Sequence, residues 1–237
     1  MYLMLATQPD LAYSISVLSK HAANPQEHHL GMAKRVLCYL KNTALLSLVY
    51  TKDLTSPPAL QTPCWPATVG YTDSDWAGDP IDRHSTAAFV FLCSETVVSW
   101  KSKKQSLIAL STTEAEYVAA SEESKEAVWL RRILSEIHRT FISDEGSSST
   151  TPSITLYIDN QAAIKLIKNP RFHERIKHIE IKRHYKRETY ENGEILLQHT
   201  PTTENIADAI TKPLSSATFW LHLQWMGLKE MENFKTL

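Results

Sequence analysis

The order of the apolar segments along the chain limits its fold more than any other feature. Three strand-like segments come close together, and two more are separated by segments with helical periodicity. The expected strands are 67–73, 86–94, 96–101, 154–158 and 194–199. The helices expected among them are 112–138, 160–168, 174–191 and 203–212. Adjacent strands followed by alternating strands and helices predict an α/β protein with a mixed sheet covered by helices.

The segments outside this pattern predict how the chain is divided. Two helices are expected before the sheet, at 10–22 and 25–42, the second with Asn24 as its N-cap and Pro25 at its first position. A proline-rich segment separates them from the first strand, and proline disfavours helix. The expected units are a helical segment at 1–50, a linker at 51–66, a main domain at 67–214 and an amphipathic tail at 215–237.

The composition argues against several classes of protein. The 237 residues have a net charge of −1, so a nucleic-acid surface requires local segregation of basic residues. The three cysteines stand far apart and form no zinc or disulfide pattern. No apolar run approaches the roughly 20 residues of a membrane-spanning helix, and the start of the chain lacks the basic flank of a signal peptide. We expect a soluble, intracellular protein without a membrane partner.

Two acidic residues lie at the ends of predicted strands. Asp73 is the last residue on one face of the first strand, and Asp75 is expected in the turn that follows. Asp159 closes the strand 154–158 where a helix begins, and functional sites of open α/β sheets gather at such strand ends. Capping of this helix by Asp159 or Asn160 is an equally good explanation.

Two further acidic residues lie on helical segments. Ser111 and Glu114 match a capping box, which gives Glu114 a structural role. Glu116 has no such role and lies on the flank of the helix face expected to cover the sheet, where an unpaired acid is unfavourable. Asp208 stands between two alanines in the predicted helix 203–212, and small neighbours allow a close approach to another surface. A solvated helical aspartate is the alternative for Asp208.

Taken together, the four acids predict a metal site. Carboxylates brought to one edge of a sheet repel one another by several kcal/mol per pair at intermediate dielectric. Bound cations remove this repulsion, and ligands that are all oxygen favour Mg²⁺ or Mn²⁺. Two such ions about 4 Å apart suit displacement at phosphorus. The residues alone therefore favour a metal-dependent phosphodiester nuclease.

Long motifs around these acids resemble a known family. They are "YTDSDWAGDPIDRHST", "VSWKSKKQSLIALSTTEAEYVAAS", "LYIDNQAAIKLIKNPRFHERIKHIEIKRHYKRE" and "ENIADAITKPL". Over roughly 67–214 the chain resembles the ribonuclease H domain of copia-type LTR retrotransposon Pol polyproteins. The resemblance implies a ribonuclease H-like five-stranded mixed sheet flanked by helices. It also implies cleavage of the RNA strand of RNA–DNA hybrids with two Mg²⁺ ions, with Mn²⁺ as a plausible substitute.

The resemblance also assigns roles to individual residues. It places the catalytic, metal-binding acids at Asp73, Glu116, Asp159 and Asp208. Asp75 is then a turn residue or a neighbour of the ligands. Ribonucleases H often carry a mobile histidine before the last acid, and His199 is the candidate here, with an exposed histidine at a strand end as the alternative. The chain departs from the family pattern at His84, where arginine is usual, and at Ala88, near a usual glycine.

The first 41 residues resemble the segment that joins the reverse transcriptase to the ribonuclease H domain. The paired aspartates of the family's polymerase site are absent from the sequence, so we expect no polymerisation by this chain. The resemblance implies the C-terminal piece of a Pol polyprotein, with the rest of that polyprotein as a possible partner. It implies a cytoplasmic location, in virus-like particles, or a nuclear one.

A basic stretch at 165–187 predicts the substrate surface, because it carries nine Lys and Arg residues against two Glu residues. Such residues neutralise phosphates and make binding depend on salt. The predicted nucleic-acid-binding residues are Lys103, Lys104, Lys177, Lys182, Arg183, Lys186 and Arg187. Trp76 and Trp100 could stack on a nucleotide, although packing in the core is the favoured explanation for each of them.

Two other functions remain open on the sequence. The chain could be a catalytically silent ribonuclease H-like remnant that binds nucleic acid or a partner. It could also be an integrase-like or nuclease-like enzyme that acts on DNA, because that superfamily shares the acid cluster. The four intact acids argue against the remnant, and the motifs argue against the DNA enzyme.

Overall fold

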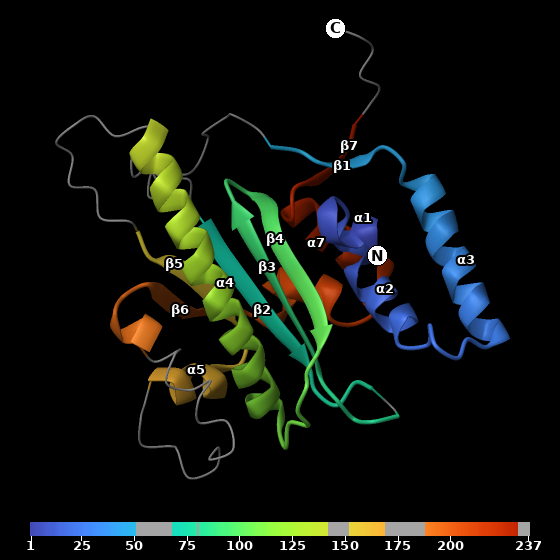
Figure 1. The fold of residues 1–237 in the computed structure, drawn as a ribbon, viewed down its shortest axis with the longest axis horizontal. Coiled ribbons are helices and arrows are strands. Elements are labelled where there is room, and N and C mark those ends of the chain that lie inside the picture. Colours follow the sequence, from blue (N-terminus) through green and yellow to red (C-terminus); the bar gives the residue numbers. More distant parts are fainter. Residues whose placement is uncertain (51–67, 80, 142–151, 169–187, 232–237) are drawn as a thin grey trace, which may run out of the picture.

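The computed structural model describes residues 1–50, 68–79, 81–141, 152–168 and 188–231 (Figure 1). Its centre is a five-stranded sheet with the strand order β4-β3-β2-β5-β6. The strands are β2 (Thr68–Asp75), β3 (Thr86–Cys93), β4 (Thr96–Lys104), β5 (Ile154–Ile158) and β6 (Ile195–His199). The pairs β2–β3 and β3–β4 are antiparallel, whereas β2–β5 and β5–β6 are parallel. The predicted mixed α/β sheet is therefore confirmed.

One face of the sheet is covered by α4 (Thr112–Phe141) and α5 (Gln161–Lys168), as Figure 1 shows. These helices bury their apolar sides against Phe89, Phe91 and Leu156 of the strands. The contact is close at Gly70 of β2. A Cβ atom there would lie 2.6 Å from the Phe91 ring and 2.8 Å from Leu156 Cδ2. The same Cβ atom would lie 2.7 Å from Glu123 Oε1 of α4, so only glycine leaves room for this packing between β2 and α4.

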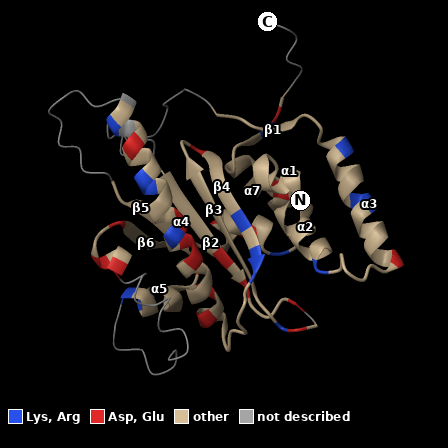
Figure 2. Cartoon of the chain, in the orientation of Figure 1, with Lys and Arg blue, Asp and Glu red and all other residues tan. Residues whose placement is uncertain are grey.

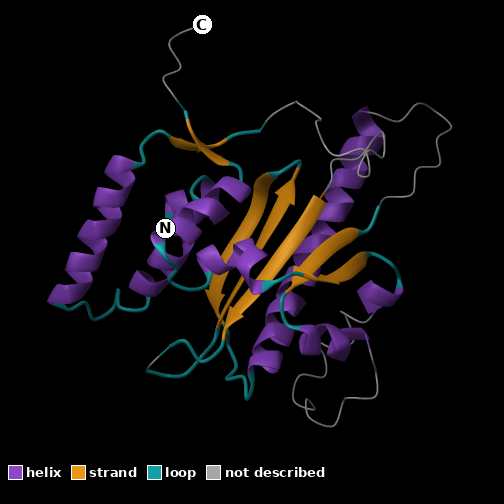
Figure 3. Cartoon of the chain, turned by 180° about the vertical axis from the view of Figure 1, so that it is seen from behind, coloured by secondary structure: helices purple, strands orange, loops and turns teal. Residues whose placement is uncertain are grey.

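The opposite face is covered by segments from both ends of the chain (Figure 3). These segments are α1 (Tyr2–Ala6), η1 (Pro9–Leu11), α2 (Ala12–Ser19), η6 (Ile206–Ile210) and α7 (Ser216–Trp225). The helix α3 (Glu27–Asn42) lies farther from the sheet and packs against α2. Met4, Leu11, Val90, Leu223 and Met226 lie in one apolar cluster there.

The two ends of the chain also pair directly with each other. The short strand β1 (Leu46–Leu48) runs antiparallel to β7 (Leu228–Glu230). The Trp100 indole N–H donates to the Met4 carbonyl at 2.7 Å, and the Tyr50 hydroxyl donates to the Val97 carbonyl at 2.7 Å. Residues 1–50 thus share their core with the sheet, and the division of the chain into four units stays a prediction.

Several predicted boundaries are wrong. Strand β2 continues to Asp75, so Asp75 lies in the strand and not in a turn. The helix predicted to start at Pro25 starts at Glu27, because the side chain of Gln26 accepts from the backbone of His29 and caps it. The helix predicted at 10–22 is the 3-10 turn η1 followed by α2.

The helix predicted at 203–212 is two 3-10 turns, η5 (Thr202–Glu204) and η6. Asn205 separates them with an extended backbone, and its side chain accepts from the Ala207 N–H. The strands β1 and β7 were not expected. Most of the predicted helical stretch 174–191 lies outside the described residues, and 188–191 are helical. Within the described part of the chain, no helix has both the length and the apolar character needed to cross a membrane.

Candidate active site

Three carboxylates converge at one end of the central sheet. Asp73 lies near the end of β2, and Asp159 directly follows the parallel neighbour β5, where Thr72 is in register with Ile158. Glu116 comes from the first turns of α4, which crosses this edge. One carboxylate oxygen from each of the three acids lies within 4.8 Å of the others. Figure 2 shows acidic residues at this end of β2 and on the adjacent turns of α4.

Glu116 is held inside the cluster by the backbone of β2. Its Oε1 accepts a hydrogen bond of 3.0 Å from the Ser74 N–H, and the residue is only 5% exposed. Burial, followed by the charges of Asp73 and Asp159, raises the pKa of Glu116 to about 10. Without a counter-charge, the cluster therefore favours a proton on Glu116.

The structure decides between two explanations for the acid after β5. Asn160 caps α5, because its Oδ1 accepts from the Ala163 N–H at 3.0 Å. Asp159 is free of that role, and its Oδ2 accepts from the Thr202 hydroxyl at 2.9 Å. Burial and the neighbouring Asp73 raise the pKa of Asp159. Asp159 therefore faces the acid cluster rather than the helix.

The fourth predicted acid lies beside this group. Asp208 is in the 3-10 turn η6 and is 4% exposed, so the solvated alternative is wrong. Burial, followed by the charge of Asp73, raises the pKa of Asp208 to about 7, against the opposing effect of Lys212. The buried Asn205 anchors this turn by donating to the Thr72 carbonyl at 2.8 Å.

Lys212 is the charged member of the site that the sequence reasoning missed. Its Nζ lies 2.9 Å from Asp208 Oδ1 and 3.6 Å from Asp73 Oδ2, and its side chain is 31% exposed. The available signal was its spacing, because a lysine four residues after an acid can pair with it on a helical turn. Burial opposes the charge of Lys212, but the neighbouring acids outweigh this and raise its pKa.

Asp73, Glu116 and Asp159 line a cleft of about 590 Å³ that also exposes an aromatic ring. Trp76 is 43% exposed on its wall, and its indole N–H donates to the Ala109 carbonyl at 3.0 Å. Trp100 instead packs against the apolar cluster beneath the N-terminal helices. The two tryptophans therefore have different surroundings: Trp76 lines the cleft, and Trp100 is half-buried against the apolar core.

His199 lies beside the cleft at the end of β6. It is exposed, and its Nε2 is 3.1 Å from the main-chain oxygen of Asp159. This contact places His199 next to the backbone of one of the acids, and its role with the last acid stays a prediction.

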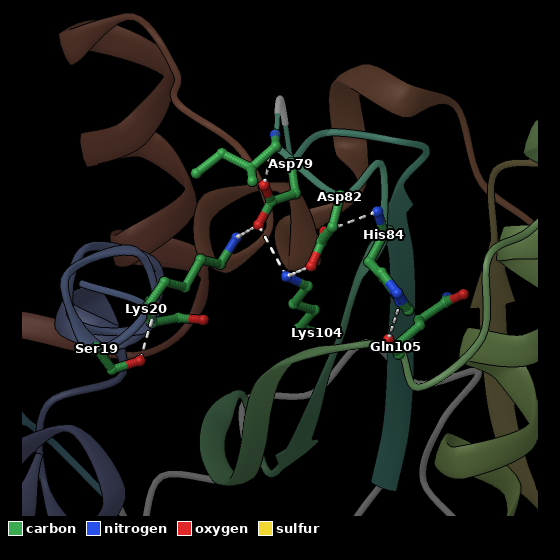
Figure 4. A network of polar contacts seen from close by, with 9 residues as sticks. Ser19, Lys20, Asp79, Asp82, His84, Lys104 and Gln105 are labelled. Atoms are coloured by element: carbon green, nitrogen blue, oxygen red, sulfur yellow. Dashed lines mark hydrogen bonds and ion pairs between the residues drawn. The ribbon is translucent and has the colours of Figure 1, made fainter. Parts of the chain in front are cut away.

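The predicted nucleic-acid-binding residues fall into three groups. Lys103 is exposed on the edge strand β4. Lys104 is paired with Asp79 at 3.0 Å and with Asp82, and Lys20, directly after α2, reaches Asp79 from the other side (Figure 4). The remaining predicted residues are Lys177, Lys182, Arg183, Lys186 and Arg187, and they lie outside the described residues. Lys104 is therefore engaged within the protein, and binding by the other residues stays a prediction.

The two departures from the family pattern do not disturb the site. Ala88 is buried and lies directly opposite Asp73 in an unbroken part of the β2–β3 ladder. The His84 Nδ1 lies 2.7 Å from the Gln105 carbonyl and ties the β2–β3 loop to the end of β4. Neither residue displaces an acid.

The donor set fits divalent cations. Among the described residues, the buried Glu116 Oε2 has no hydrogen-bond partner. The buried Asp73 Oδ2 and Asp208 Oδ1 face the ammonium of Lys212. Buried acceptors without partners are rare in native proteins. Oxygen ligands of this kind suit Mg²⁺ or Mn²⁺, although the identity of the ion does not follow from them.

The chain is similar to curated proteins over almost its whole length, although no protein-family model matches it. It is 36% identical over 228 residues to the retrovirus-related Pol polyprotein from transposon TNT 1-94 of Nicotiana tabacum, covering 96% of this chain. It is 35% identical over 213 residues to that from transposon RE1 of Arabidopsis thaliana, covering 90% of this chain. The matches span only 16% and 13% of those polyproteins.

A third relative has a different name. The secreted RxLR effector protein 161 of Plasmopara viticola is 46% identical over 130 residues, which cover 55% of this chain and 84% of that protein.

Solved structures with similar folds include two with ribonuclease H or reverse transcriptase in their descriptions. The foamy viral protease-reverse transcriptase in complex with an RNA/DNA hybrid has a TM-score of 0.43 and 17% identity, over 70% of this chain and 22% of that chain. The N-terminal ribonuclease H domain of a Mycobacterium tuberculosis protein has a TM-score of 0.39 and 14% identity, over 67% of this chain and 97% of that chain.

The strand order and the convergence of acids at the ends of β2 and β5 define a ribonuclease H-like domain. With the sequence relatives, this places the chain in the family of copia-type retrotransposon Pol polyproteins.

Proposed function

We propose that the chain is an endoribonuclease that cuts the RNA strand of RNA–DNA hybrids as part of a retrotransposon Pol polyprotein. The observation that carries this proposal is the convergence of Asp73, Glu116 and Asp159 from three separate elements into one cleft. The adjacent Asp208 completes the four acids that the family resemblance implies. A helix cap or a solvated surface does not explain three of these acids, because Asp73, Glu116 and Asp208 are buried.

In this proposal, the protein supplies the ligands and holds them in place. Asp73, Glu116, Asp159 and Asp208 are the metal ligands, and the Ser74 N–H and the Thr202 hydroxyl orient Glu116 and Asp159. Two Mg²⁺ ions, or Mn²⁺ in their place, would activate water and stabilise the leaving oxygen of the cut phosphodiester. His199, at the cleft edge, is the proposed group for moving a proton near the last acid.

Substrate selection in this proposal depends on backbone shape. An RNA–DNA hybrid presents a wide minor groove with 2′-hydroxyls on one strand only. Lys103 and the basic residues of 177–187 supply charge for phosphates, while Trp76 offers an exposed ring on the cleft wall. The rest of the Pol polyprotein is the proposed partner.

The test is cleavage of a labelled RNA–DNA hybrid by the purified chain in Mg²⁺, with EDTA as one control. Glu116→Gln and Asp159→Asn should abolish cleavage and leave hybrid binding largely intact. Glu136→Gln is the matched control, because Glu136 is an exposed acid on the same helix as Glu116. Its cleavage should equal that of the wild type.

The other outcomes identify the alternatives. A folded protein that binds the hybrid without cutting it would be a silent remnant. Cutting of duplex DNA with the hybrid left intact would support the DNA enzyme. Cleavage that survives both Glu116→Gln and Asp159→Asn would remove the carboxylate cluster from the mechanism.

A further inference from the structure

Lys212 occupies a defined place within the carboxylate cluster. Its ammonium is 2.9 Å from Asp208 Oδ1 and 3.6 Å from Asp73 Oδ2, so it bridges two buried acids. The side chains of these acids are 5% and 2% exposed. An ammonium at this distance from buried carboxylates interacts with them far more strongly than one on the surface does.

The backbone holds Lys212 in that place. The N–H groups of Thr211 and Lys212 both donate to the Asp208 carbonyl at 3.1 Å, which closes a turn between the acid and the lysine. The Thr211 hydroxyl donates to the Ala207 carbonyl at 2.6 Å and fixes the same turn from its buried side. Lys212 therefore faces Asp208 because of the local fold and not through a chance surface contact.

The acids form two neighbouring cation positions that share Asp73. The first position is surrounded by Asp73, Glu116 and Asp159, whose ligand oxygens lie within 4.8 Å of one another. The second lies between Asp73 and Asp208, and there the positive charge is the ammonium of Lys212. The two positions differ, because among the described residues a cation of the protein itself occupies the second position and none occupies the first.

We propose that Lys212 is a built-in counter-ion that stabilises the metal-free cluster and competes with a divalent cation for the position between Asp73 and Asp208. This inference rests on the proposed function, since it concerns the same acids. Ion binding at the first position leaves Lys212 in place. Ion binding at the second position requires the ammonium of Lys212 to withdraw from Asp73 and Asp208. The affinity for a divalent cation is therefore lower at the second position than at the first.

The test is a titration of the full chain with Mn²⁺, in which the electron paramagnetic resonance signal of the free ion measures how much ion is bound. The wild type should bind a first Mn²⁺ ion more tightly than a second one. Lys212→Met removes the competitor and should tighten the weaker binding step by about tenfold or more, equivalent to about 1.4 kcal/mol. Lys212→Arg keeps the charge and should leave the second step weak.

Thermal unfolding in EDTA supplies a second readout that does not depend on activity. Lys212→Met should lower Tm in EDTA because the acids lose their counter-ion, and Mn²⁺ should remove most of that loss. Lys20→Met is the matched control, since Lys20 pairs with the buried Asp79 at 3.2 Å outside the cleft. Its Tm should fall without rescue by Mn²⁺, and its Mn²⁺ titration should match that of the wild type.

The outcomes separate this inference from the proposed function. Equal Mn²⁺ affinities in the wild type and Lys212→Met would overturn the inference and leave the nuclease proposal standing. The predicted change in affinity without hybrid cleavage would support the inference and contradict the nuclease. Absence of Mn²⁺ binding in every variant would contradict both. If Lys212→Met does not fold, Lys212→Gln provides the same comparison with a polar side chain.

Discussion

The Asn205 side-chain amide donates a 2.8 Å hydrogen bond to the carbonyl of Thr72, although the two residues are 133 positions apart. Thr72 directly precedes Asp73, and Asn205 begins the turn that carries Asp208. This bond ties the two acids to one another through the main chain. It explains how a short 3-10 turn can present a carboxylate to the centre of the sheet.

Loss of this bond should affect both stability and the site. Asn205→Ala leaves the buried Thr72 carbonyl without its partner, and we expect the free energy of unfolding to fall by about 1–3 kcal/mol. Urea unfolding measures this change, and a Mn²⁺ titration should show weaker binding because Asp208 is less well placed. Asn24→Ala, at an exposed position, should change stability by less than about 0.5 kcal/mol. Equal effects of the two substitutions would contradict this role of Asn205.

Two glycine substitutions should change stability in opposite directions. Gly70→Ala places a Cβ within 3 Å of Phe91 and Leu156, and such overpacking should destabilise the protein by about 1–3 kcal/mol. In Gly31→Ala the added Cβ meets no atom of the described residues within 4 Å, and the position lies inside α3, so the substitution should stabilise the protein by about 0.5–1 kcal/mol. Chemical denaturation measures both. A neutral Gly70→Ala would show that α4 and the sheet are less closely packed than described.

The metal-free protein should become less stable as the pH rises. The pKa of Asp208 is raised to about 7 and that of Asp159 is also raised, so the folded state holds protons that the unfolded chain releases near pH 4. The unfolding free energy in EDTA should therefore fall from about pH 4, by about 1.4 kcal/mol per pH unit for each extra proton. The contribution of Asp208 ends near pH 7, and that of Glu116, whose pKa is raised to about 10, continues above it. Unfolding curves across this range measure the slope.

A divalent ion should reverse this trend, because it binds the deprotonated acids. Stabilisation by Mg²⁺ should be larger at about pH 8 than at about pH 5. Asp208→Asn removes one of the titrating groups and should flatten the slope in EDTA. Stability that increases with pH in EDTA would show that the acids do not repel one another as described.

The two tryptophans should respond differently to substitution. Trp76→Ala removes the exposed ring on the cleft wall and should weaken hybrid binding by about 1–3 kcal/mol, with a small effect on folding. Trp100→Ala removes a half-buried ring that packs against the core, so it should destabilise the protein by about 3 kcal/mol. Fluorescence-anisotropy binding and urea unfolding separate these effects. Unchanged hybrid binding by Trp76→Ala would exclude stacking by this ring.

The basic stretch should account for part of the salt dependence of binding. Joint replacement of Lys182, Arg183 and Lys186 by alanine should weaken hybrid binding and lower its salt slope by about one unit per lost phosphate contact. Lys104→Ala should leave the slope unchanged, because Lys104 is paired with Asp79 and Asp82. An unchanged slope in the triple variant would remove this stretch from the substrate path.

Local patterns in the sequence were enough to predict much of the fold. The alternation of apolar residues located all five strands of the central sheet, and the order of the segments predicted the mixed arrangement. Asp73 and Asp159 could be found because each lies at the end of an apolar strand. The end of β2 was misplaced, since Asp75 remains in the ladder opposite Thr86 and only the partner strand reveals this.

The tertiary structure decided the features that depend on distant partners. Asn160 and not Asp159 caps α5, and Asp208 is buried, although the sequence allowed the opposite in both cases. The pairing of β1 with β7 joins the two ends of the chain and leaves no local signal in either segment.

The sequence by itself determined that Asp73 and Asp159 lie at or near the ends of apolar strands and in which order the elements follow, because periodicity is a property of neighbouring residues. Only the tertiary structure decided that Lys212 stands between Asp73 and Asp208. That contact depends on how closely η6 approaches β2. The approach is set by packing and by the Asn205–Thr72 hydrogen bond across the chain.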